Sequence, residues 1–113
     1  MSNEKDRSPV SAVVEGAFAK VWGEEAVVAI IGLKVETTEA DRVSTEVSKF
    51  GEVEDVFLVT GDIDVWLKVR FPHYSDLKEF VVHRLPEVRG IRDTKTLIVV
   101  TTYKESGERK LTP

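Results

Sequence analysis

Residues 53–71 read VEDVFLVTGDIDVWLKVRF, and they are the most informative stretch of the chain. Two segments rich in Val, Phe, Leu and Trp, 53–59 and 63–71, lie on either side of Thr60-Gly61-Asp62. β-branched and aromatic residues favour strands, and a Gly-Asp pair between two such runs favours a tight turn. The stretch therefore predicts a β-hairpin with Gly61-Asp62 as a two-residue turn.

The second strand of this hairpin alternates in polarity. Its apolar row comprises Ile63, Val65, Leu67, Val69 and Phe71, and its other row comprises Asp64, Trp66, Lys68 and Arg70. Successive side chains of a strand point to opposite faces of the sheet. The apolar row is therefore expected to face a core.

The residues before the hairpin predict a strand and a helix. Residues 26–35 are apolar in both alternating rows, which is typical of a strand buried on both faces. A helix is expected next, because Thr38 and Asp41 form a capping pattern and Gly51 is placed to end the helix. The apolar stripe of this helix comprises Ala40, Val43, Val47 and Phe50.

The residues after the hairpin predict a second helix and a last strand. Ser75 is expected to cap this helix, and Pro86 is expected to close it. A strand is expected over about 94–103. The order strand, helix, strand, strand, helix, strand predicts an α+β fold of the ferredoxin-like βαββαβ type, with two helices on one face of an antiparallel sheet.

Residues 10–22 carry apolar residues at helical spacing, so an extra N-terminal amphipathic helix is expected within residues 1–24. The folded domain is expected over 25–104, and a polar tail over 105–113. Two helices cover only one face of a four-stranded sheet, yet the predicted strands carry apolar residues on both faces. An uncovered apolar face usually marks an interface, so we expect a dimer formed through the sheet, with Trp66 as an anchor.

Composition limits the class of protein. The 113 residues suit one domain, and the net charge of −4 gives no broad basic field for nucleic acid. Cysteine is absent, which excludes disulfides and thiolate metal sites. No apolar run is long enough to span a membrane, and residues 1–7 contain no apolar signal core, so a soluble cytoplasmic protein is expected. The scarcity of Gln, Asn and Met beside 32% charged residues favours a thermophilic source.

No motif predicts catalysis. His73 and His83 have no spacing that suggests a shared metal, and Asp62 and Asp64 alone are weak evidence for one. The chain has no nucleophile elbow, phosphate loop or dinucleotide fingerprint. We therefore expect neither an enzyme nor a bound cofactor or metal. Backbone N–H groups at Gly61 could hold a carboxylate and a nearby Asp an ammonium group, although an exposed Gly-Asp turn fits the same residues.

A family resemblance adds weight to the first interpretation. The sequence Val59-Thr60-Gly61, then Asp64 and then Lys68-Val69, resembles the signature of the effector-binding (RAM) domain of the Lrp/AsnC transcription regulators. Residues 88–91 and 94–100 resemble the closing segment of that domain, although Pro86 and Gly90 are separated where the family has them adjacent. About 24 residues precede the first predicted strand, too few for the family's helix-turn-helix domain.

The resemblance implies a site for a small effector, most often an amino acid, between dimers that assemble into higher-order rings. The matching positions are Gly61, Asp62, Ile63, Asp64, Tyr74, Thr94, Thr96, Leu97 and Ile98. It implies Asp64 as the acceptor for the effector's ammonium group and the backbone N–H groups of Gly61 and Asp62 as donors to its carboxylate. Tyr74, Leu97 and Ile98 would shape the side-chain pocket, with a core position as the alternative for the last two.

The expected protein is therefore a stand-alone amino-acid-binding regulatory module that acts through oligomeric assembly. Its expected partners are a small effector, further copies of itself and full-length regulators of the same family, without direct DNA or membrane binding. Two alternatives stay open. One is a small dimeric α+β-barrel enzyme, which would need polar groups between sheet and helices, and the other is a purely structural oligomerisation module.

Overall fold

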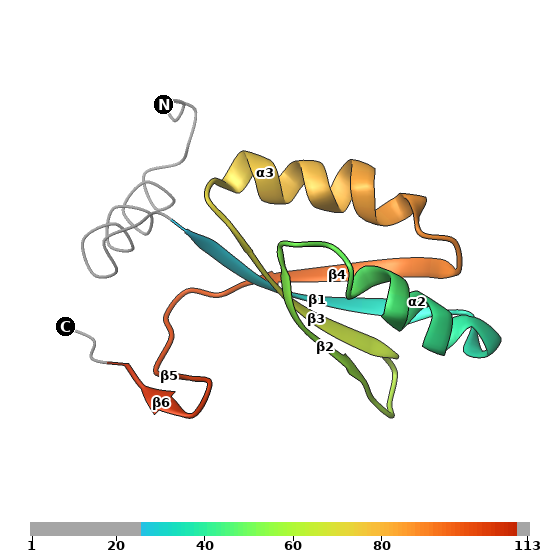
Figure 1. Ribbon diagram of the computed structural model, residues 1–113, viewed down its shortest axis with the longest axis horizontal. Coiled ribbons are helices and arrows are strands. Elements are labelled where there is room, and N and C mark those ends of the chain that lie inside the picture. Colours follow the sequence, from blue (N-terminus) through green and yellow to red (C-terminus); the bar gives the residue numbers. More distant parts are fainter. Residues whose placement is uncertain (1–25, 111–113) are drawn as a thin grey trace. The chain divides into compact units, whose positions relative to one another are not determined.

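The computed structural model describes residues 26–110, and the chain divides into two compact units (Figure 1). One unit is Val27–Val99, and the other comprises Met1–Ala26 and Val100–Pro113. The helix expected over 10–22 lies outside the described residues. The unit Val27–Val99 carries the candidate site.

This unit is a four-stranded antiparallel sheet with two helical segments. Its elements are β1 (Val27–Val35), α2 (Ala40–Val47), β2 (Val53–Leu58), β3 (Val65–Phe71), α3 (Tyr74–Glu79) and β4 (Ile91–Ile98). The strand order is β2-β3-β1-β4, so β1 and β3 are central and β2 and β4 are the edges. β1 pairs antiparallel with both β3 and β4. The ferredoxin-like order predicted from the sequence is confirmed.

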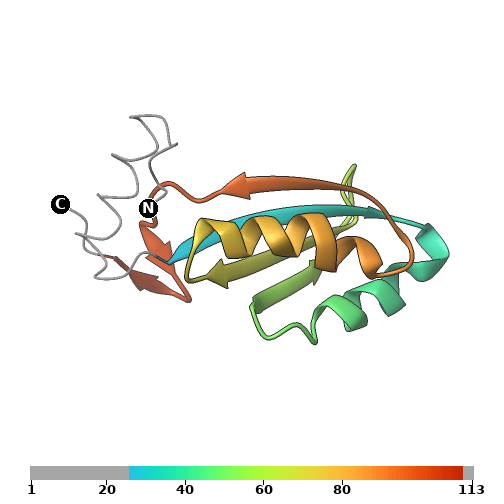
Figure 2. The ribbon, with the colours of Figure 1, turned by 90° about the horizontal axis from the view of Figure 1, so that it is seen from above.

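One row of each central strand forms the core. The buried residues of the two central strands are Val27, Ala29, Ile31, Leu33 and Val35 on β1 and Val65, Leu67, Val69 and Phe71 on β3. The helical segments add Val43, Val47, Leu77, Phe80 and Leu85. Figure 2 shows α3 lying over the sheet. Burying one such side chain stabilises the fold by about 1.5–3 kcal/mol, so this single core holds the two layers together.

The opposite face of the sheet is only partly covered. Val28 and Ile30 belong to the second row of β1 and are half-buried, as is Trp66 on β3. The expectation that residues 26–35 are buried on both faces is therefore wrong for the single chain. Both helices pack on the other row, and among the described residues no helix covers this face.

The predicted helix caps are wrong. A 3-10 turn, Thr37–Glu39, precedes α2, and the N-cap residue is Glu39, whose side chain makes no capping hydrogen bond. The α3 helix begins at Tyr74 after His73, so Ser75 lies inside its first turn. Backbone carbonyls replace the side-chain caps: the amides of Asp76 and Leu77 donate to the carbonyl of His73.

Helix and strand ends also differ from the prediction. α2 ends at Val47, before Gly51, and Ser48 is its C-cap residue. After α3 the chain continues as a π-helical turn, Phe80–Arg84, and a 3-10 turn, Leu85–Glu87, that contains Pro86. The last strand spans Ile91–Ile98 rather than 94–103. Ile91 already pairs with Val35 next to a β-bulge, and the pairing with β1 ends at Ala29↔Ile98.

In the second unit, residues 104–109 form a small hairpin. β5 (Lys104–Glu105) pairs antiparallel with β6 (Glu108–Arg109). Ser106 and Gly107 make its turn with φ angles of 52° and 82°. Two successive positive φ angles match the twist of a two-residue hairpin turn.

Candidate functional site

The hairpin turn predicted at Gly61-Asp62 is a wider loop, residues 59–64. The β2–β3 ladder ends at the pair Leu58↔Val65, and the amide of Val59 donates to the carbonyl of Asp64 at 2.9 Å. Gly61 has a φ of +130°, a conformation that residues with a Cβ rarely adopt. The two-residue turn is therefore wrong, and four residues, 60–63, protrude beyond the closing hydrogen bond.

Asp64 fastens this loop to the end of β1. Its amide donates to the carbonyl of Leu33 at 3.0 Å, and its carboxylate Oδ2 accepts a hydrogen bond from the amide of Val35 at 2.9 Å. The last β1–β3 pair is Leu33↔Val65, so the carboxylate serves as the next acceptor beyond the ladder. Val35 is only 4% exposed, and a buried N–H group without a partner is costly.

Lys34 makes a second attachment. Its Nζ donates to the carbonyl oxygen of Asp62 at 2.7 Å. Two adjacent residues at the end of β1 therefore hold the loop: Lys34 binds Asp62, and Val35 binds Asp64. Asp62 itself is exposed, and its carboxylate has no hydrogen bond or ion pair with another residue of the part that the structure describes.

Ile63 makes a third contact, on an unexpected face. A Cβ added to Gly32 would lie 2.9 Å from the indole of Trp66 and 3.0 Å from the side chain of Ile63. Gly32 pairs with Trp66, whose row faces away from the helices. The prediction that Ile63 continues the buried row of Val65 is therefore wrong, because β3 begins only at Val65 and Ile63 still belongs to the loop.

The candidate residues of β4 divide between the two faces of the sheet. Thr94, Thr96 and Ile98 pair with Leu33, Ile31 and Ala29, which face the core, whereas Leu97 pairs with Ile30 on the open face. Leu97 and Ile98 are 48% and 40% exposed, so neither is a core residue in the single chain. Only Thr94 lies level with the end of β1 that holds the loop.

Tyr74 lies at the other end of the sheet. β3 runs from Val65 beside the loop to Phe71, and the steps between its seven residues span about 20 Å in total. Tyr74 follows this far end and is 55% exposed. One chain therefore brings Gly61, Asp62, Ile63 and Asp64 together beside the end of β1, and Thr94 lies level with them but on the other side of β1. Tyr74 lies at the far end of the sheet, and Leu97 and Ile98 lie further along β4.

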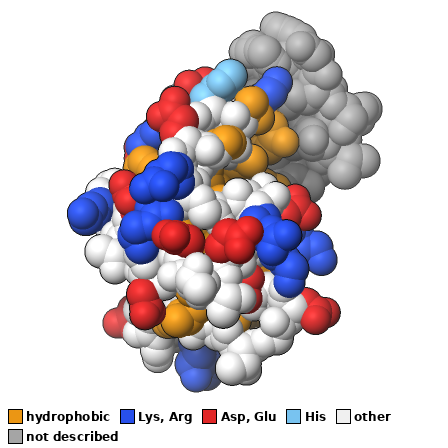
Figure 3. Space-filling view, turned by 90° about the vertical axis from the view of Figure 1, so that its right-hand side faces the viewer, with side chains coloured by type: hydrophobic (Ala, Val, Ile, Leu, Met, Phe, Trp, Pro, Cys, Tyr) orange, Lys and Arg blue, Asp and Glu red, His pale blue; other side chains and the backbone are white. Residues whose placement is uncertain are grey.

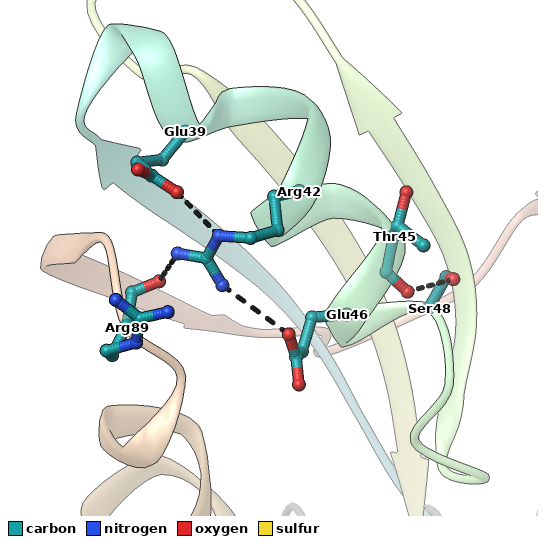
Figure 4. Close-up of polar contacts among 6 residues, drawn as sticks. All are labelled: Glu39, Arg42, Thr45, Glu46, Ser48 and Arg89. Carbon is teal, nitrogen blue, oxygen red and sulfur yellow. Dashed lines mark hydrogen bonds and ion pairs between the residues drawn. The ribbon is translucent and has the colours of Figure 1, made fainter.

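The sequence analysis missed a second polar region, the seam between the helical segments. A depression of about 560 Å³ lies there, lined by four basic and two acidic side chains around Phe50 and Val88. We call its residues 42–50 and 84–90 the interhelical seam. Arg42 of α2 contacts Glu39 and Glu46 and donates to the carbonyl of Arg89 at 2.7 Å (Figure 4).

Arg84 is equally engaged in this seam. Its guanidinium donates two hydrogen bonds of 3.0 Å to Glu52 and lies over the rings of Phe50 and Phe80, 5.1 and 5.2 Å from their centroids. The hydrogen bond from Arg84 lowers the pKa of the Glu52 carboxyl below its ordinary value. In the same way, Arg70 lowers the pKa of Glu54 on β2. Arg42 and Arg84 of the seam therefore both bind carboxylates of their own chain, which is typical of a structural contact.

Charges are mixed elsewhere too. Seen from the end of the sheet where β1 ends and β4 begins, Figure 3 shows acidic and basic side chains next to one another.

Within residues 26–110, no three His, Asp or Glu side chains are grouped so that they could hold a metal ion. No described helix is long and apolar enough to cross a membrane. The fully buried side chains of the described residues are apolar, and the hydroxyl oxygen of Ser44 on α2 is also buried, without a hydrogen-bond partner among them.

The sheet order, the two helices on one face and the loop at the end of β1 define a ferredoxin-like α+β domain with one open sheet face. Residues 28–109 match the model of the Lrp/AsnC ligand binding domain, and the chain belongs to this family. The resemblance read from residues 53–69 is thereby confirmed.

Relatives support the same assignment. The chain is 31% identical over 111 residues to an uncharacterized HTH-type transcriptional regulator, YugG of Bacillus subtilis, and covers 66% of that protein. It is 33% identical over 67 residues to the leucine-responsive regulatory protein of Escherichia coli, which is 59% of this chain and 41% of that protein. The chain thus spans between 41% and 66% of the length of these relatives. Their names indicate a regulatory family rather than an enzyme family.

Solved structures agree on the fold. AsnC of Escherichia coli aligns with a TM-score of 0.66 at 19% identity, over 96% of this chain and 64% of that chain. A complex of the regulator NMB0573 of Neisseria meningitidis with L-Met aligns with a TM-score of 0.63 at 23% identity, over 90% of this chain and 60% of that chain. FFRP-DM1 aligns with a TM-score of 0.63 at 24% identity, over 66% of this chain and 99% of that chain.

Proposed function

We propose that this chain is an effector-binding regulatory module that holds a small amino acid at the loop 59–64, at a junction between subunits. The observation that carries the proposal is the shape of the loop. The amides of Gly61 and Asp62 have no hydrogen-bond partner among residues 26–110, and Gly61 adopts a φ of +130°. Free N–H groups in a glycine turn suit a carboxylate, and the Asp62 carboxylate beside them suits an ammonium group.

A second copy of the chain would complete this site. Tyr74, Leu97 and Ile98 are exposed. Tyr74 follows the far end of β3 from the loop of its own chain, and Leu97 and Ile98 pair with Ile30 and Ala29, three and four positions before Leu33 along β1. A neighbouring subunit packed end to end could bring its own Tyr74 or Ile98 to the loop. The separation within one chain therefore supports a site shared between subunits rather than one inside a single domain.

The open face of the sheet supports a dimer. Phe57 of β2 is 58% exposed, and it pairs with Trp66, which lies over Gly32. Together with the half-buried Val28 and Ile30 of β1, these side chains form an apolar patch between Lys and Arg side chains of the same face. An apolar centre with a polar rim is the usual composition of a subunit interface.

Binding would act through assembly. An effector that binds between subunits favours the assembly in which its site is complete, and the population shifts in proportion to that difference in affinity. The Neisseria structure is a complex with L-Met, and the Escherichia coli relative is named leucine-responsive. An amino acid is therefore the effector class to test first, and full-length regulators of the family are the partners to test next.

The test is a thermal-shift panel of the twenty amino acids with light scattering in parallel. It uses the wild type, Gly61→Ala and the matched control Gly51→Ala. An added Cβ has no neighbour within 4 Å at either position, but only Gly61 has a positive φ. A ligand present at a hundred times its Kd stabilises the native state by about 2.7 kcal/mol, which such a panel detects. We expect one or a few amino acids to stabilise the wild type and Gly51→Ala, and to lose most of that effect in Gly61→Ala.

The structural oligomerisation module is the second candidate, and the open apolar face favours it. It predicts a stable oligomer that no amino acid stabilises or reshapes. If light scattering finds such an oligomer and the whole panel is silent, this second candidate replaces the effector-binding proposal.

A further inference from the structure

The two aspartates of the loop differ in what their carboxylates contact. We infer that Asp64 and Lys34 are positioning residues, which hold the loop 59–64 in its binding shape, and that Asp62 supplies the carboxylate that contacts the effector's ammonium group. This inference rests on the proposed function, and it assigns to Asp64 a different role from the direct contact that the family resemblance implies.

Asp64 has the geometry of a structural residue. Its main chain and its side chain bind Leu33 and Val35, which are alternate residues of β1, at 3.0 and 2.9 Å. These two bonds continue the β1–β3 ladder by one step after the strands separate. Because Val35 is buried, its amide needs the acceptor that Asp64 provides. This carboxylate is thus engaged within the chain through Oδ2, whereas the Asp62 carboxylate has no hydrogen-bond partner among the described residues.

Lys34 holds the next part of the loop through the main-chain carbonyl of Asp62. The hydrogen bond from its Nζ reaches the carbonyl of Asp62 and leaves the Asp62 side chain free. With this carbonyl fixed, the Asp62 side chain and the neighbouring amides keep a constant arrangement. Ile63 adds an apolar anchor against Gly32 and Trp66. The loop is thus held at three consecutive residues, 62 to 64, and its free polar groups include the amides of Gly61 and Asp62 and the Asp62 carboxylate.

The Asn substitution separates the two roles. In Asp64→Asn the side-chain oxygen still accepts the Val35 amide, but the negative charge is gone. In Asp64→Ala both are lost. A positioning role predicts that Asp64→Asn restores most of the affinity that Asp64→Ala loses. A direct contact with an ammonium group predicts that both variants lose the same affinity, since that contact depends on the charge.

The experiment combines binding with hydrogen exchange. The affinity for each of the twenty amino acids is measured for the wild type, Asp64→Asn, Asp64→Ala, Asp62→Asn and Lys34→Met, with Lys49→Met on the chain just after α2 as the control lysine. The exchange rate of the Val35 amide is measured in the same proteins without ligand. We expect Asp64→Ala to speed that exchange and Asp64→Asn to keep it slow. We expect Asp62→Asn to lose about ten- to hundredfold in affinity with no change in the Val35 exchange, which is the effect of one charge-assisted hydrogen bond.

Two results would overturn the inference. One is an Asp64→Asn protein that keeps the Val35 amide protected yet binds as weakly as Asp64→Ala, because its loop is then intact and only the charge is missing. The other is an Asp62→Asn protein that binds as tightly as the wild type. If the wild type binds no amino acid, the proposed function fails and the role of Asp62 fails with it. The Val35 exchange still decides whether Asp64 positions the loop.

Discussion

Two glycines with positive φ angles, one in each polar region of this domain, show how the two regions differ. Gly90, in the interhelical seam, has a φ of +99°, and a Cβ there would lie 2.9 Å from Val43 and 3.1 Å from Arg42. Gly61, in the loop 59–64, has a φ of +130°, and a Cβ there would meet nothing within 4 Å. Both positions need the same backbone freedom, but only Gly90 is also needed for close packing. Gly90 is therefore packed against side chains of the helix α2, whereas the space around Gly61 is free for a ligand.

The hydrogen bonds of the two regions differ in the same way. In the seam, Arg42 and Arg84 use their guanidinium groups on carboxylates and on a carbonyl of their own chain. In the loop, the attachments from Lys34 and Val35 leave the Gly61 amide and the Asp62 carboxylate unused by the described residues. The two arginines of the seam are therefore engaged within the chain, although Glu87 and the buried hydroxyl of Ser44 have no partner among the described residues. In the loop, the groups without a partner include a backbone amide and a carboxylate next to each other in the chain, which suits a ligand. Substitutions in both regions can test this difference.

The largest effect is expected at Gly90. In Gly90→Ala the new Cβ meets the buried Val43 side chain, and the positive φ adds backbone strain. Overpacking costs about 1–3 kcal/mol and the left-handed conformation about 1–2 kcal/mol, so the free energy of unfolding should fall by about 2–5 kcal/mol. Urea denaturation followed by the far-ultraviolet circular dichroism of the domain measures it. A loss below about 1 kcal/mol would mean that the seam is not tightly packed at this point.

A smaller effect on stability, but a larger one on binding, is expected at Gly61. Gly61→Ala has the backbone strain without the collision, so we expect the free energy of unfolding to fall by about 1–2 kcal/mol. Subtracting this loss from that of Gly90→Ala leaves the contribution of packing at Gly90. The same denaturation series supplies both values, with Gly51→Ala as the common control. If Gly61→Ala destabilised the fold as strongly as Gly90→Ala, the loop would be part of the core and the distinction would fail.

Local sequence patterns account for the layers of the fold but not for the loop. The alternation of Val65, Leu67 and Val69 predicts the buried row of β3, because a strand's period of two and one covered face leave no other arrangement. The same alternation misplaces Ile63, since that residue precedes the start of the strand. The hydrogen bond between Asp64 and Val35 joins residues 29 positions apart, and no local pattern contains it.

The helix caps failed for a related reason. A Thr or Ser before an apolar stripe predicts a side-chain cap, but backbone turns compete for the same N–H groups. At α3 the carbonyl of His73 accepts from both Asp76 and Leu77 and leaves Ser75 without a capping role.

At the site, the residue types were predictable from sequence, whereas their division between two ends of the sheet depends on strand register. Register follows from which residues pair across the sheet, as in Leu33↔Thr94 and Ala29↔Ile98.

The smallest effect is expected from the ion pair between Arg84 of the seam and Glu52, and it should depend on pH. The hydrogen bond from Arg84 holds the pKa of Glu52 below its ordinary value of 4.5 in the folded protein. A carboxyl group whose pKa is lowered by folding stabilises the fold above its unfolded pKa, and this contribution is lost as pH falls through the folded pKa. Because both side chains are about one third exposed, solvent screening limits the contribution to about 1 kcal/mol or less.

Glu52→Gln should therefore lower the free energy of unfolding slightly at pH 7 and flatten its decline below pH 4.5. Glu87→Gln, in the same seam but without an ion pair among the described residues, is the matched control and should follow the wild-type curve. Effector affinity at neutral pH should be the same in the wild type and in both variants, because Glu52 binds Arg84 and neither Glu52 nor Glu87 belongs to the loop 59–64. A Glu52→Gln protein with normal stability but weakened effector binding would contradict the comparison, since it would show that the seam takes part in recognition.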